Sequence, residues 1–158
     1  HQSFDNTETR ESFSNQFRDM GISRDRLIFL GYTQDINQYL EAYSLIDISL
    51  DPIPFGGGTT TYESTWMGVP VLTMVGEGIM GRLTGSIMTR LGYPEFVTYS
   101  HDAYVSRAIE IVSDLSKLSE IRQNLRIAAN TYIFDAANYV GELESACRDI
   151  WIKYCNDN

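Results

Sequence analysis

The run Asp51-Pro-Ile-Pro-Phe-Gly-Gly-Gly-Thr-Thr-Thr-Tyr-Glu63 joins an apolar stretch, residues 46–50, to a segment with a helical pattern. This order of strand, glycine-rich turn and helix is typical of a parallel sheet covered by helices. Glycines let the backbone approach a ligand closely, and the first N–H groups of a helix attract an anion. The run therefore predicts an element of the fold and a candidate diphosphate site at the same place.

The alternation of strands and helices continues on both sides of this run. We expect strands at residues 27–30, 46–50, 71–75 and 96–98, and helices at 7–20, 35–44, 59–67, 79–91, 104–115, 118–129 and 136–154. The sequence thus predicts an α/β fold, a Rossmann-like parallel sheet with flanking helices followed by a C-terminal helical segment. We expect residues 1–158 to form a single domain, because this length suits one compact core.

Composition excludes several classes of protein. The formal net charge of −9 argues against nucleic-acid binding, which normally needs a basic surface. We see no apolar run long enough to span a membrane and no signal peptide, so we expect a cytoplasmic protein. Cys147 and Cys155 lie too far apart on one predicted helix to pair, and no metal-ligand pattern surrounds them. We interpret both thiols as packing residues.

The glycine run by itself supports two interpretations. Gly57 and Gly58, followed by the hydroxyls of Thr59, Thr60 and Thr61, offer donors for a diphosphate. Alternatively, the glycines form a flexible turn and a threonine only caps the helix. No lysine follows the glycines, which excludes a Walker A loop. Glu63, one helical turn further on, could accept hydrogen bonds from ribose hydroxyls or could remain simply solvated.

A second glycine pattern competes with the first. Residues 76–81, Gly-Glu-Gly-Ile-Met-Gly, satisfy the dinucleotide-binding pattern directly after a predicted strand. Two strands precede it, however, and Glu77 would place negative charge beside a pyrophosphate. We keep an NAD-binding domain that uses Gly76 and Gly81 as a minority hypothesis. Arg82 follows this pattern and could face a diphosphate or form a surface ion pair.

Three segments together resemble the C-terminal catalytic region of the O-GlcNAc transferase and SPINDLY-like family. They are Ile46-Asp-Ile-Ser-Leu-Asp51, the Gly-Gly-Gly-Thr-Thr-Thr-Tyr-Glu63 run and Trp66-Met-Gly-Val-Pro-Val-Leu-Thr73. The resemblance implies the C-terminal half of a GT-B glycosyltransferase with the sugar nucleotide in the cleft. It further implies inverting transfer to protein Ser or Thr, from UDP-GlcNAc or, in SPINDLY-like members, from GDP-fucose. The family generally needs no metal, so we expect no cofactor.

The resemblance also implies roles for single residues. Thr59 and Thr60 would hold the diphosphate, Glu63 would bind ribose, and the backbone near Tyr32 and Thr33 would meet the base. Two residues depart from the family pattern: Tyr39 stands where many relatives have a histidine in the base-side helix, and Gly58 where animal enzymes have another. Tyr39 could still stack on a base. No catalytic residue is assigned, and the candidate binding residues are Tyr32, Thr33, Tyr39, Gly57, Gly58, Thr59, Thr60, Thr61, Glu63 and Arg82.

The N-terminal half of the family's catalytic region, a donor-binding lysine and the usual TPR repeats are not in this sequence. We therefore interpret the chain as a fragment that is inactive alone and whose protein acceptor would bind through the missing part. A non-catalytic scaffold is the alternative. In Rossmann-like strand order, two missing strands would separate residues 27–30 from 46–50. We expect these two runs to pair directly or, failing that, the exposed sheet edge to form a homodimer.

Overall fold

The computed structural model describes residues 2–157 and divides the chain into two compact units, His1–Glu41 and Ala42–Asn158. The first unit contains two α-helices, α1 (Thr7–Asp19) and α2 (Ile36–Glu41), and two short 3-10 helices, η1 (Gln2–Asp5) and η2 (Arg24–Arg26). Asn6 caps α1, because its side-chain oxygen accepts a 2.7 Å hydrogen bond from the N–H of Glu8. The helices predicted at residues 7–20 and 35–44 are thus present, the second continuing as η3 (Ala42–Leu45).

The strand predicted at residues 27–30 is absent from the structure. These residues are not assigned to any strand, and the side chain of Ile28 is 76% exposed. Phe29 instead packs its ring against Phe4, with 5.3 Å between centroids, and beneath the guanidinium of Arg24. An apolar run becomes a strand only where a neighbouring strand completes its hydrogen bonds. The prediction of a strand at residues 27–30 is therefore wrong.

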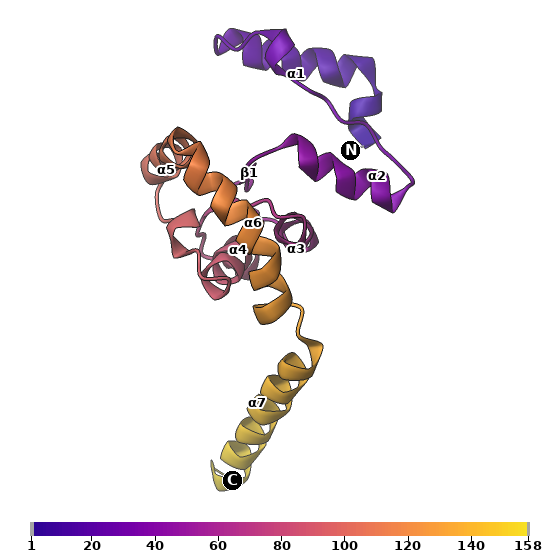
Figure 1. Ribbon diagram of the computed structural model, residues 1–158. Helices are drawn as coiled ribbons and strands as arrows, with labels where there is room; N and C mark the ends of the chain where they lie inside the picture. Colours follow the sequence, from indigo (N-terminus) through magenta and orange to yellow (C-terminus); the bar gives the residue numbers. More distant parts are fainter. Residues whose placement is uncertain (1, 158) are drawn as a thin grey trace. The chain divides into compact units, whose positions relative to one another are not determined.

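The second unit, whose first strand is labelled in Figure 1, is built on a parallel sheet of three strands in the order β1-β2-β3. They are β1 (Ser49–Leu50), β2 (Val71–Met74) and β3 (Val97–Thr98), with Ser49 opposite Val71 and Thr73 opposite Val97. Helix α3 (Thr59–Trp66) connects β1 to β2, and α4 (Ile79–Arg90) followed by η4 (Pro94–Phe96) connects β2 to β3. This confirms the α/β class, although β1 is shorter than the predicted strand at residues 46–50.

Two more helices, α5 (His101–Ser113) and α6 (Leu115–Tyr132), complete the core of this unit. Helix α6 buries one face, which carries Leu118, Ile121, Leu125 and Ala129, and it contacts α3. The side chains of Leu72, Met88, Phe96 and Leu125 are fully shielded from solvent. Burial of this apolar surface is the main source of stability for the sheet that carries the glycine run.

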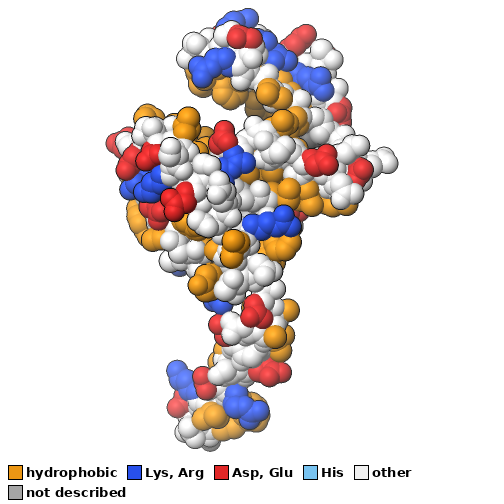
Figure 2. Space-filling view, viewed as in Figure 1, with side chains coloured by type: hydrophobic (Ala, Val, Ile, Leu, Met, Phe, Trp, Pro, Cys, Tyr) orange, Lys and Arg blue, Asp and Glu red, His pale blue; other side chains and the backbone are white. Residues whose placement is uncertain are grey.

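The last helix, α7 (Ala136–Asp157), has no buried residue. Arg90 of α4 donates to the carbonyl of Tyr132, the last residue of α6, at 2.7 Å and to the Glu142 carboxylate of α7 at 3.1 Å. Hydrophobic side chains reach the surface along this helix (Figure 2). Leu143 and Trp151 are among the exposed ones. Cys147 and Cys155 are also exposed, so their predicted packing role is wrong. Neither α7 nor another helix within residues 2–157 has the length and apolar character needed to cross a membrane.

Candidate functional site

The glycine run lies where β1 ends and α3 begins, at the carboxyl edge of the parallel sheet. Gly58 is the N-cap of α3, and its carbonyl accepts from the N–H of Thr61 at 3.0 Å. Within residues 2–157, the backbone N–H groups of Gly58, Thr59 and Thr60 have no hydrogen-bond partner. Unpaired N–H groups at the positive end of a helix dipole are suited to an anion.

A buried carboxylate supports the loop from inside the protein. Asp51, directly after β1, is only 6% exposed. One of its carboxylate oxygens accepts from the N–H of Gly57 and the other from the hydroxyl of Thr73, each at 2.7 Å. No role for Asp51 is predicted from the sequence alone. The only signal was its position: it follows a buried strand and precedes eleven residues, 52–62, without a charge.

The carbonyl of Gly57 is held as well. Thr84 of α4 donates its hydroxyl to this carbonyl at 3.3 Å, and the hydroxyl of Thr61 lies 3.0 Å from that of Thr84. Thr61 and Thr84 are both buried. The hydroxyl of Thr61 therefore contributes to the support of the loop, whereas the exposed Thr59 and Thr60 face solvent.

Tyr104 of α5 also reaches the start of the loop. Its hydroxyl donates to the backbone carbonyl of Asp51 at 3.1 Å. Burial raises the pKa of the Tyr104 phenol above its ordinary value, and the negative charge of Asp51 adds to this increase. The phenol consequently stays protonated, and able to donate, at neutral pH.

Some of the candidate binding residues lie in the first unit and some in the second. Gly57, Gly58, Thr59, Thr60 and Glu63 lie together on the loop and the first two turns of α3. The three base-side candidates, Tyr32, Thr33 and Tyr39, belong to the first unit, with Tyr39 on α2. The N–H of Tyr32 donates to the Asp5 carboxylate at 3.3 Å. The hydroxyl of Thr33 donates to Gln38 at 3.0 Å.

Arg82 does not belong to the glycine loop. Its guanidinium donates weakly to the carbonyl of Gly78, at 3.5 Å, and it lines a cavity of about 440 Å³ together with Ser86 and Tyr99. Met80 and Leu83, on another face of α4, are the side chains nearest to Gly58. None of the other candidate residues borders this cavity.

The competing glycine pattern has a structural explanation. The N–H of Gly76 donates to the carbonyl of Gly81 at 2.8 Å, which folds the loop back on the first turn of α4. A Cβ atom on Gly81 would lie 2.9 Å from the Cα of Gly76, closer than such atoms can approach. Glycine at these two positions is accounted for by this backbone contact.

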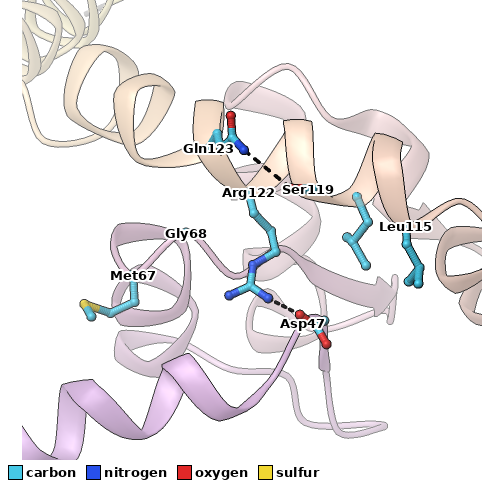
Figure 3. A pocket seen from close by; sticks show the side chains of 8 residues that line it. Asp47, Met67, Gly68, Leu115, Ser119, Arg122 and Gln123 are labelled. Carbon is cyan, nitrogen blue, oxygen red and sulfur yellow. Dashed lines mark hydrogen bonds and ion pairs between the residues drawn. The ribbon is translucent and has the colours of Figure 1, made fainter.

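A cavity of about 480 Å³ lies at the opposite edge of the sheet, between the end of α3 and α6 (Figure 3). Arg122 crosses it to form an ion pair with Asp47, which precedes β1, and Gly68, which precedes β2, borders it. Ligands of open α/β sheets bind beyond the carboxyl ends of the strands. This cavity lies at the amino ends, so the glycine loop remains the candidate site.

Comparison with known proteins identifies relatives over most of the chain. Residues 6–143 match the family model described as glycosyl transferase family 41. A rice protein named probable UDP-N-acetylglucosamine–peptide N-acetylglucosaminyltransferase SPINDLY is 36% identical over 93% of the chain, and a Caenorhabditis elegans UDP-N-acetylglucosamine–peptide N-acetylglucosaminyltransferase is 27% identical over 85%.

A solved structure agrees with these matches. A mutant O-GlcNAc transferase of Thermobaculum terrenum superposes over 97% of the chain with a TM-score of 0.86 and 30% identity. The chain spans 16% of the rice relative, 12% of the C. elegans relative and 29% of the solved chain. The similarity therefore extends over nearly all of this sequence but over only a small part of each relative.

Proposed function

Because this chain belongs to glycosyl transferase family 41, we propose that its glycine loop holds the diphosphate of a nucleotide-sugar donor. The observation that carries the proposal is the set of unpartnered N–H groups on Gly58, Thr59 and Thr60. The exposed hydroxyls of Thr59 and Thr60 add donors beside them. A diphosphate could be bound there mainly by hydrogen bonds and the helix dipole. A scaffold domain would not need this arrangement.

The donor proposed first is UDP-GlcNAc, because the relatives' names include UDP-N-acetylglucosamine. The longer protein would transfer GlcNAc, with inversion, to Ser or Thr of an acceptor that binds outside this chain. GDP-fucose is the second candidate donor. Tyr32, Thr33 and Tyr39 would meet the base. We expect the chain alone to bind the nucleotide without catalysing transfer, and its cytoplasmic location remains a prediction.

Nucleotide binding by the chain can be mapped residue by residue. UDP and GDP, added separately, are expected to shift the backbone amide resonances of Gly56, Gly57, Gly58 and the first two turns of α3. The measurement is NMR chemical-shift mapping at increasing nucleotide concentration. Shifts confined to residues 76–81 would assign binding to the other glycine pattern and contradict the proposal.

Glu63 provides a more specific test of the ribose contact. Glu63→Ala is expected to weaken UDP binding by about 1.5–3 kcal/mol, roughly 10- to 150-fold, because a charge-assisted hydrogen bond is lost. The melting temperature is expected to change little. Calorimetry and thermal unfolding measure the two effects, with Glu144→Ala on α7 as a surface control. A lower melting temperature with unchanged affinity would make Glu63 a structural residue.

The edge of the sheet at β1 is a candidate surface for homodimer formation. Within the described sheet, β1 pairs only with β2. We therefore keep the proposal that a second copy of the chain could pair with this edge. Light scattering over a dilution series is the direct measurement, and a constant monomer mass would exclude the homodimer.

A further inference from the structure

Asp51 is the only buried acidic or basic side chain within residues 2–157. Placing a carboxylate in the interior is costly unless hydrogen bonds replace its lost hydration. Here both carboxylate oxygens have a donor, the N–H of Gly57 on one and the hydroxyl of Thr73 on the other. Neither the fold nor the proposed nucleotide contacts yet account for a buried charge at this position.

The two bonds to Gly57 determine the direction of the neighbouring peptide planes. The N–H of Gly57 points toward the interior because it donates to the buried Asp51 carboxylate. The carbonyl of Gly57 also points toward the interior, because it accepts from the hydroxyl of the buried Thr84. In a trans peptide, the N–H of the next residue points opposite to that carbonyl. The N–H of Gly58 is thereby directed away from the buried Thr84.

We infer that Asp51 is a positioning residue that holds the loop ready for the diphosphate, so that no loop ordering is needed when the ligand binds. This inference rests on the proposed function. Pre-ordering matters because each segment that must be immobilised on binding reduces affinity. The negative charge of Asp51 does not help an anion to bind. Its effect is geometric, exerted through the peptide of Gly57.

Substitutions can separate geometry from charge. Asp51→Ala removes both acceptors and is expected to weaken UDP and GDP binding by about tenfold or more. Asp51→Asn removes the charge but keeps an oxygen for the N–H of Gly57, so most of the affinity is expected to remain. Hydrogen exchange of the Gly57 amide, measured without nucleotide, is expected to be fast in Asp51→Ala and slow in the wild type and Asp51→Asn.

Thr98→Val is the matched control, because it removes another buried hydrogen bond, from the Thr98 hydroxyl to the carbonyl of Thr73, outside the loop. It is expected to lower the melting temperature and leave nucleotide affinity unchanged. Equal losses of affinity in Thr98→Val and Asp51→Ala at similar melting temperatures would overturn the inference. So would wild-type affinity in Asp51→Ala.

Two further outcomes remain decisive. If Asp51→Ala does not fold, Thr73→Val takes its place, since it removes one of the two donors that orient the carboxylate. Weaker nucleotide binding by Thr73→Val then supports the inference, and unchanged binding overturns it. A wild-type chain that binds neither nucleotide refutes the proposed function. Equally tight binding by the wild type and Asp51→Ala, or by the wild type and Thr73→Val where Asp51→Ala does not fold, refutes only the role of Asp51.

Discussion

A Gly56→Ala variant is expected to lose detectable nucleotide binding and about 1–3 kcal/mol of its free energy of unfolding. The new Cβ would lie 2.7 Å from a carboxylate oxygen of Asp51 and 3.0 Å from the carbonyl of Met80. The carboxylate is held by Thr73, and the carbonyl belongs to the backbone of α4, so the loop itself must move. Calorimetric titration with UDP and denaturant unfolding measure the two losses.

Gly58→Ala is the matched control, two residues along the same run. The nearest atoms to its added Cβ are 3.7 Å away and belong to the side chains of Leu83 and Met80. We expect a change of about 1 kcal/mol or less in the free energy of unfolding, the usual range for an N-cap substitution. Equal losses of nucleotide affinity in Gly56→Ala and Gly58→Ala would show that the close approach of Gly56 to Asp51 is not what shapes the loop.

Leu125→Ala is expected to lower the free energy of unfolding by about 2–5 kcal/mol, the largest effect of a single substitution on stability proposed here. The Leu125 side chain is fully buried in α6, and its removal leaves a cavity in the core shared with the sheet. Urea unfolding followed by circular dichroism measures the change. Because the core supports the sheet and the loop after β1, the same variant is expected to bind nucleotide only at temperatures where it remains folded.

Ile127→Ala, in the same helix, tests whether burial is the cause. Ile127 is 67% exposed, so its truncation leaves no cavity. We expect a change within about 0.5 kcal/mol, typical of a surface site. A large loss in Ile127→Ala would mean that this face of α6 is covered in solution.

Much of the fold could be read from the sequence because helices and buried strands have local patterns. The helix predicted at residues 59–67 begins at Thr59 as expected, and Val71–Met74 forms a strand next to it. At residues 27–30 the local pattern predicted the wrong secondary structure. Their apolar run looks like a strand, but Phe29 packs against Phe4 and Ile28 is exposed. A run of four apolar residues is compatible with a strand, a helix or a loop. Which of these forms depends on the segments that pack against the run.

The sequence by itself predicted the position of the candidate site, since the glycine and threonine run lies between a predicted strand and a predicted helix, and the structure has β1 and α3 at these places. Only the tertiary structure revealed its support. The partner of Asp51 on β2 is 22 residues away, and Thr84 is 27 residues from the Gly57 carbonyl that it holds. Thr61 likewise turns inward, and Arg82 lies on another face of its helix, because packing decides these directions. A local pattern specifies a turn, but the groups that hold it come from segments that meet only when the chain folds.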